Sequence, residues 1–86
     1  MNPASVPAIA REVMRIIVRR KHVRPERIRP RTRLQEELHF DPIDLVDVIL
    51  DLEKRYHMVI PDEVPLTTVG DFVKYVARHQ PAPVTA

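Results

Sequence analysis

Three aspartates recur at a spacing that would place them on one side of a helix. Asp44, Asp47 and Asp51 stand at positions i, i+3 and i+7 of an apolar run that ends near Tyr56, and residues three and four apart are neighbours on a helix surface. Carboxylates in this arrangement can bind the cationic side chains of a partner. The same stripe is also the ordinary solvated face of an amphipathic helix, so both interpretations stay open.

The residues just before these aspartates form a typical helix start. Asp41 suits the N-cap, and Pro42 suits the first helical position, where a backbone N–H has no partner within the helix. Asp44 in the first turn is favoured by the positive end of the helix dipole. Helix initiation therefore explains Pro42 completely, and no catalytic role competes with it.

The amino-terminal third predicts one long helix and then a long connection. Ser5 or Asn2 is a candidate N-cap, and apolar residues at helical spacing follow it. The helix should end near Lys21, because Pro25 pushes the residue before it out of helical geometry. Residues 23–40 are too polar and too broken by proline for a strand, so we expect a connection there.

Within this connection, Thr32 and Gln35 have the spacing of a capping box, which predicts a single helical turn over residues 33–38. Four apolar residues are spaced as if to fix the connection to the core: Val23, Ile28, Leu34 and Leu38.

The carboxyl-terminal part predicts one more helix and a tail. Thr68 and Asp71 form a second capping box, so a helix should run from Val69 to about His79. Its expected buried stripe comprises Val69, Phe72, Val73 and Val76. Residues 81–86, with two prolines, predict a flexible tail, and residues 1–80 a single domain.

The acidic helix and its flanks resemble the acyl carrier proteins. In that family an Asp-Ser-Leu-Asp head opens a hydrophobic and acidic helix, and an Ile-Pro-Asp-Glu segment follows it. This chain has Asp41-Pro42-Ile43-Asp44 and then Ile60-Pro61-Asp62-Glu63, and the likeness covers roughly residues 9–80. The resemblance implies an all-α fold, a small acyl-carrier-protein-like helical bundle with three longer helices, a short helical segment and a long first loop.

By this resemblance, Pro42 occupies the position of the serine that carries phosphopantetheine. The phosphodiester forms on a hydroxyl, which proline lacks, and the only serine, Ser5, belongs to the far end of the first helix. The family's Gly-Ala pair before the aspartate is replaced by His39-Phe40, which we expect to crowd residue 42. The segment after residues 60–63 is shortened where the family has a small helix. The resemblance therefore predicts a carrier fold with no covalent cofactor.

The acidic helix is also, by resemblance, the surface with which carriers dock on basic patches of their enzymes. Apolar residues within this helix support docking through it if they are exposed. We predict these partner-binding residues: Asp41, Ile43, Asp44, Leu45, Asp47, Leu50, Asp51 and Glu53.

Basic residues crowd the other part of the chain. Residues 1–33 hold nine arginines and Lys21 against two acids, a net charge of +8, whereas residues 34–86 hold four basic residues against ten acids, a net charge of −6. This asymmetry predicts attraction within the bundle, or weak self-association that salt disrupts. The arginine-rich segment 19–33 matches phosphate or carboxylate groups, but no aromatic residue interleaves it to stack on bases.

The sequence lacks the residues that catalysis or metal binding would require. The chain has no cysteine and a single glycine, no nucleophile–base–acid set, and four histidines that never fall at metal-ligand spacing. We predict that it is not an enzyme and binds no metal or other cofactor. No apolar run approaches the ~20 residues of a membrane span, and Met1–Ala10 lacks the basic residues of a secretion signal, so the expected location is the cytoplasm.

These observations favour a protein-interaction module of the acyl-carrier type. It would lack phosphopantetheine and dock, through its acidic second long helix, on a carrier-recognising enzyme or scaffold with a basic surface. One alternative is an acyl carrier protein of fatty-acid or polyketide biosynthesis by ancestry, inactive alone. The other is a basic nucleic-acid-binding helical bundle, which salt-dependent retention on a phosphate column would identify.

Overall fold

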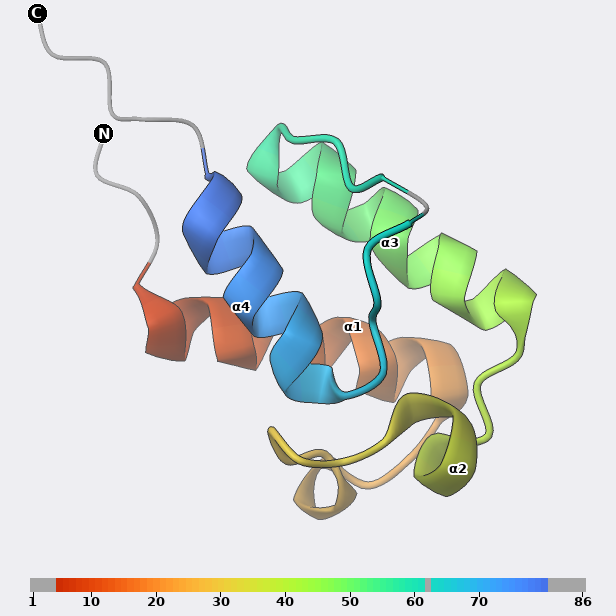
Figure 1. The fold of residues 1–86 in the computed structure, drawn as a ribbon. Coiled ribbons are helices and arrows are strands. Elements are labelled where there is room, and N and C mark those ends of the chain that lie inside the picture. Colours follow the sequence, from red (N-terminus) through yellow and green to blue (C-terminus); the bar gives the residue numbers. More distant parts are fainter. Residues whose placement is uncertain (1–4, 62, 81–86) are drawn as a thin grey trace, which may run out of the picture.

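The computed structural model describes residues 5–61 and 63–80. It contains α1 (Val6–Lys21), the 3-10 turn η1 (Pro25–Arg27), α2 (Leu34–Leu38), α3 (Pro42–Tyr56) and α4 (Val69–His79). Within these residues the β pairing amounts to one isolated bridge, between Arg33 and Thr68. The predicted all-α bundle of three longer helices and a short one is confirmed (Figure 1).

Helix α1 has the bounds that its sequence predicts. The Ser5 hydroxyl accepts a hydrogen bond from the Ala8 N–H at 3.3 Å and caps the helix. Asn2, the other candidate cap, lies outside the described residues. The helix ends at Lys21 because His22 adopts a left-handed conformation with φ 54°, and its N–H donates to the carbonyl of Val18.

The core lies between α1, α3 and α4. Helix α4 crosses α1 and packs against it, and α3 packs against α1 as well (Figure 1). Phe72 is fully buried among residues of all three helices, which include Ile9 and Ile17 of α1 and Leu52 of α3. The predicted buried stripe of α4 is confirmed, since Val69, Phe72, Val73 and Val76 are all buried.

The connection before α2 departs from its prediction in one detail. The hydroxyl of Thr32 donates to the carbonyl of Arg27 and accepts from the N–H of Arg29, both at 2.9 Å, so it closes the preceding turn. The N-cap of α2 is Arg33, whose N–H donates to a Glu37 carboxylate oxygen at 2.7 Å. The predicted helical turn therefore forms, but the Thr32–Gln35 capping box is wrong.

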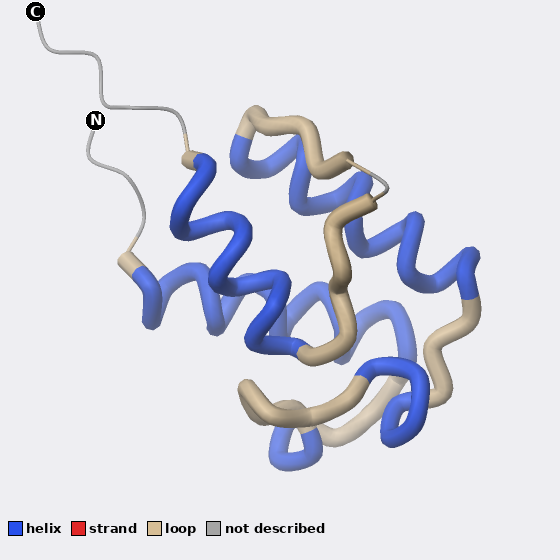
Figure 2. The backbone as a smooth tube through the Cα atoms, in the orientation of Figure 1, coloured by secondary structure: helices blue, strands red, loops and turns tan. Residues whose placement is uncertain are grey.

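The same connection is fastened to the start of α4. The N–H of Leu34 donates to Thr67 at 2.9 Å, that of Val69 to Thr32 at 3.0 Å, and that of Gly70 to Pro30 at 2.9 Å. These three backbone hydrogen bonds hold the beginning of α4 beside the long connection (Figure 2). Ile28, Leu34 and Leu38 are buried, and Val23 packs against the core, as predicted.

The segment after α3 contains no helix in its described residues, 57–61 and 63–68. Helix α3 ends at Tyr56 because His57 is left-handed, with φ 52°. Glu53 then accepts the N–H of Ile60 at 2.8 Å, and the hydroxyl of Tyr75 donates to the carbonyl of Val59 at 3.3 Å. The segment is thus held between α3 and α4.

Candidate functional site

Helix α3 begins with a complete capping box around Pro42. The Asp44 N–H donates to the Asp41 carboxylate at 2.8 Å, and the Asp41 N–H donates to the Asp44 carboxylate at 3.2 Å. Pro42 is exposed at the first helical position, where no N–H is needed. The predicted helix start is confirmed, and Asp44 contributes a second capping bond.

Lys21 links this helix start to the end of α1. Its Nζ donates to Oδ2 of Asp44 at 2.8 Å and to the carbonyl of His39 at 3.2 Å. It also lies 5.8 Å from the centre of the Phe40 ring. The hydrogen bond from Lys21, with the one from the Asp41 backbone, lowers the pKa of Asp44. Asp44 is therefore already engaged within the chain.

Two further ion pairs continue the contact between α1 and α3. The guanidinium of Arg20 pairs with the carboxylate of Asp47. Towards the other end of α3, Nε of Arg55 lies 3.0 Å from a carboxylate oxygen of Glu12, a side chain that is only 14 % exposed. The Lys21–Asp44 and Arg20–Asp47 pairs have the predicted polarity, with the base on α1 and the acid on α3, whereas the Arg55–Glu12 pair has the reverse.

The acidic stripe (Asp44, Asp47 and Asp51) thus lies at the contact with α1. Its first two members are paired with Lys21 and Arg20. The third, Asp51, is exposed and lines the same shallow hollow as Arg19 and Arg20. The charged side of α3 faces basic residues of its own chain.

The outward side of α3 is apolar. Ile43 is 69 % exposed, Val46 50 % and Leu50 47 %, and these three residues, at i, i+3 and i+7, form what we call the apolar stripe. Ile43 and Leu50 are among the predicted partner-binding residues, whereas Val46 is not. The signal that identifies it is its position on the helix, opposite the fully buried Val48 and Leu52.

The structure therefore divides the eight predicted partner-binding residues. Asp41, Ile43, Leu50 and Asp51 are exposed. Leu45 is half-buried against the core, so the condition that it be exposed is not met. The remaining three are engaged in bonds within the chain: Asp44, Asp47 and Glu53.

A cavity of about 230 Å³ opens beside Pro42, between α2, the start of α3 and the segment before α4. Its apolar lining comes from Leu34, Phe40, Leu45 and Leu66. Phe40 is only 5 % exposed and belongs to the core, and it lines this cavity together with Pro42. That it crowds residue 42 stays a prediction. His39 is exposed and does not line the cavity.

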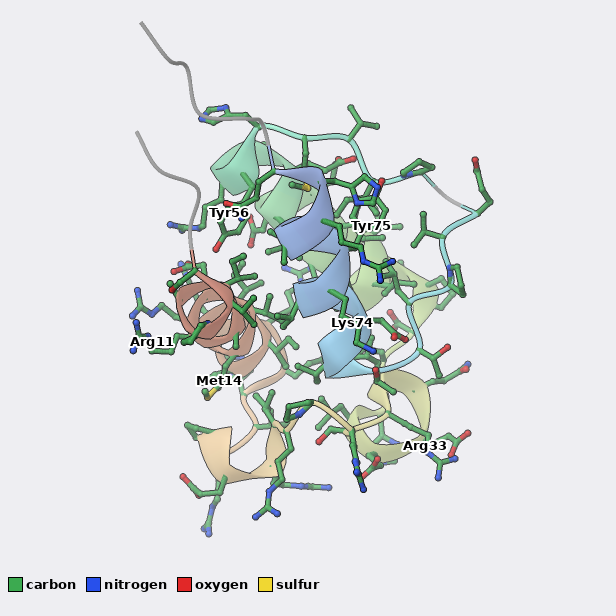
Figure 3. All side chains as sticks on the ribbon, turned by 60° about the vertical axis from the view of Figure 1, so that its left-hand side comes forward. Arg11, Met14, Arg33, Tyr56, Lys74 and Tyr75 are labelled. Atoms are coloured by element: carbon green, nitrogen blue, oxygen red, sulfur yellow. The ribbon has the colours of Figure 1, made fainter. Side chains whose placement is uncertain are left out.

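The arginine-rich segment forms one end of the molecule. Arg24, Arg29 and Arg31 are exposed and form no ion pair with any residue in the described part of the chain. Arg27 donates to the carbonyl of Glu37 at 3.3 Å, and Arg33 pairs with Glu36 at 2.6 Å. Figure 3 shows Arg33 and other nitrogen-tipped side chains extending outwards at this end.

Among residues 5–61 and 63–80 no three histidine or acidic side chains gather in an arrangement that could hold a metal ion. In the same ranges no helix has the length and apolar character that crossing a membrane requires.

The fold, a capped acidic helix inside a small helical bundle with a long first connection, is of the carrier type. No protein-family model matches the chain. Its relatives include three proteins named acyl carrier protein: from Wolinella succinogenes, 32 % identical over 75 residues (85 % of this chain and 99 % of the relative); from Rubrobacter xylanophilus, 37 % over 76 residues (86 % and 94 %); and from Chlamydia trachomatis, 37 % over 71 residues (80 % and 92 %). The chain belongs to the acyl carrier protein family. Its relatives are carriers and not enzymes in themselves.

Proposed function

We propose that this chain is a protein-interaction module of the acyl-carrier type that cannot be phosphopantetheinylated. The observation that carries the proposal is Pro42, which by resemblance occupies the serine position at the start of α3 and has no hydroxyl. The serine of the chain, Ser5, is committed elsewhere as the N-cap of α1. A covalent arm therefore has no point of attachment at the helix start.

The proposed contact surface is helix α3. Support comes from its exposed apolar residues, since apolar side chains gathered on an exposed helix face mark interaction sites, and from Asp41 and Asp51, which flank them and are exposed. The partner we propose is an enzyme or scaffold that recognises carrier proteins, in fatty-acid synthesis or a related cytoplasmic pathway. The sequence alone predicts a basic surface on that partner, but Asp44 and Asp47 already pair with Lys21 and Arg20 within the chain.

Amide NMR mapping tests this function. A purified carrier-recognising condensing enzyme of bacterial fatty-acid synthesis is added to the isotope-labelled chain, and the amide signals are followed. We expect shifts or line broadening confined to α3 and to the residues that precede it. Signals that stay unchanged, or that change only around the connection before α2, would contradict docking through α3.

The unpaired arginines favour a second candidate, the basic nucleic-acid-binding bundle. Arg24, Arg29 and Arg31 present their guanidinium groups to solvent without an acidic partner in the described residues, and arginine binds phosphate well. Retention on phosphocellulose separates the candidates. Binding that weakens steeply as salt rises, and that duplex DNA competes away, favours the nucleic-acid function. Elution at low salt favours the interaction module.

A further inference from the structure

We propose that the partner of α3 contacts it through an apolar surface and not a basic one, because two of the three aspartates of the acidic stripe already pair with cations of the chain itself. This inference rests on the proposed docking through α3 and specifies the chemistry of the partner. Arg20 pairs with Asp47, and Lys21 pairs with Asp44 at 2.8 Å. Both cations come from the last turn of α1, a fixed element of the fold.

The geometry of α3 separates the two stripes. Successive residues of an α-helix advance by about 100° around its axis, so the acidic stripe and the apolar stripe lie on adjacent sides. Val48 and Leu52 point into the core, the acidic stripe turns towards α1, and the apolar stripe is left outermost. A partner that approaches α3 from solvent meets the apolar stripe first.

The charges argue in the same direction. An arginine or lysine of a partner could pair with Asp44 or Asp47 only by displacing Lys21 or Arg20. One ion pair would then replace another, so the net attraction would be small. Arg19 lies beside Asp51 in the same hollow and would repel an incoming cation. In contrast, covering Ile43, Val46 and Leu50 removes apolar area from water without displacing any existing contact. The fitting partner therefore presents an apolar helix face or groove with a rim that is not basic.

Two synthetic peptides test the inference. Both are helical and share one leucine face; the polar side carries glutamine in the first and arginine in the second. Each is titrated into the labelled chain at low and at high salt, and the amides of residues 43–50 are followed. We expect both to shift the apolar stripe with affinities within about threefold of each other, and salt to change neither affinity by more than about threefold, because screening acts on charge pairs.

The outcomes distinguish the two proposals. If the arginine peptide binds more than about tenfold more tightly than the glutamine peptide, and salt removes the difference, the apolar assignment is wrong while docking through α3 stands. If neither peptide shifts α3, docking through α3 fails, and the present inference fails with it.

Matched variants locate the contact. Leu50→Ser should weaken the glutamine peptide about tenfold, since it removes apolar area from the contact. Val59→Ser should leave the affinity unchanged, because Val59 is 76 % exposed but lies outside α3. If the two variants behave alike, the peptide does not bind at the apolar stripe.

A gain of function tests the role of α1. Replacing Arg20 and Lys21 by glutamine should free Asp44 and Asp47 and raise the affinity of the arginine peptide about tenfold at low salt, with the glutamine peptide unchanged. If the amide spectrum shows that the double variant does not fold, the test is made with Lys21→Gln alone. Arg11→Gln is the control, since Arg11 extends away from the rest of the bundle (Figure 3). If these substitutions leave the affinity of the arginine peptide unchanged, the inference is overturned.

Discussion

Nζ of Lys21 lies 2.8 Å from Oδ2 of Asp44, and this one contact joins the last residue of α1 to the first turn of α3. The same carboxylate oxygen accepts the N–H of Asp41 and completes the capping box. Lys21 also holds the carbonyl of His39, the residue that ends α2. A single ammonium group therefore stabilises the junction of three helices beside Pro42.

This contact makes stability depend on pH. The bond to Lys21 lowers the pKa of Asp44 in the folded chain, so the stabilisation is fully present above the unfolded pKa of about 4 and is lost as pH falls through the lower, folded value. We expect the melting temperature to fall on acidification below about pH 4. Lys21→Gln should make this fall shallower, and Arg19→Gln should leave it unchanged. Thermal melts from neutral to strongly acid pH measure the effect.

Part of the acid sensitivity should persist in Lys21→Gln because of Asp71. Burial acts to raise the pKa of Asp71, but hydrogen bonds from Thr68 and Thr67 outweigh it, and the net shift is downwards. An unchanged acid profile in Lys21→Gln would mean that the Lys21–Asp44 bond contributes nothing to stability.

Two of the three left-handed histidines among the described residues provide a second prediction. His22 and His57 end α1 and α3 with φ of 54° and 52°, a conformation that favours glycine because a Cβ atom is strained there. Each His→Gly substitution should raise the free energy of unfolding by about 0.5–1 kcal/mol. Denaturant titration measures the change.

His79 is the matched control for these substitutions. It is the last residue of α4, it is not left-handed, and it stacks on Tyr75 at 4.0 Å between ring centres. His79→Gly should therefore lower stability by at least about 0.5–1 kcal/mol. Destabilisation of all three variants alike would contradict the role assigned to the left-handed positions.

The single glycine gives a third prediction. A Cβ atom at Gly70 would lie 2.9 Å from the carbonyl oxygen of Pro30, which also accepts the Gly70 N–H. Alanine is the better helix former by about 1 kcal/mol, but the contact is with backbone that other hydrogen bonds hold in place. We expect Gly70→Ala to lower the free energy of unfolding by about 1–3 kcal/mol.

Lys74→Ala controls for helix propensity in α4, because Lys74 is exposed in the same helix, and it should change stability by less than about 0.5 kcal/mol. A Gly70→Ala variant more stable than the parent would show that the Pro30 loop yields readily, and that helix propensity decides the effect.

Local sequence signals predicted the helices well, because each helix end is decided by a few neighbouring residues. Ser5, Asp41 and Thr68 all cap where their types and spacing indicate. The predicted cap at Thr32 was wrong because its hydroxyl can bond either to the start of α2 or within the preceding turn. In the structure it bonds within the preceding turn. The neighbouring residues alone do not indicate which of two such hydrogen bonds forms.

The candidate site was predicted less completely, because it depends on how helices distant in sequence are placed. The pairing of Arg20 with Asp47 follows from the rotation of α1 against α3, which no motif encodes. The burial of Phe40 was not predicted, because only its closeness to Pro42 in sequence was considered. Its spacing after the buried Leu34 and Leu38 was the better guide, and it indicates a core residue.

Introducing a hydroxyl at residue 42 gives the fourth prediction. Pro42→Ser should fold and lose only about 0.4–1 kcal/mol of stability, mostly through a freer unfolded chain. With coenzyme A and a phosphopantetheinyl transferase, we expect it to be modified far more slowly than an ordinary carrier, because Lys21 occupies Asp44 and the arginine-rich end repels a basic enzyme. Adding Lys21→Gln should recover part of the rate. The rates are measured by intact mass over time, with Pro42→Ala as the unmodifiable control.

A companion substitution at Phe40 is unsuitable for this test. Since Phe40 is buried in the core, Phe40→Ala should cost about 3–5 kcal/mol. His39→Gly is compatible, because His39 is exposed with φ 55°. If Pro42→Ser alone is modified at a normal rate, the chain is an ordinary carrier by ancestry that lost one residue.

The central claim is the absence of a point of attachment, and intact-mass spectrometry of the native chain tests it most directly. The full chain is incubated with coenzyme A and a broad-specificity phosphopantetheinyl transferase, beside an ordinary acyl carrier protein that must be converted completely. We predict that the chain keeps its unmodified mass, since Pro42 offers no hydroxyl. A gain of one phosphopantetheine group that peptide mapping assigns to residues 39–45 would contradict the claim.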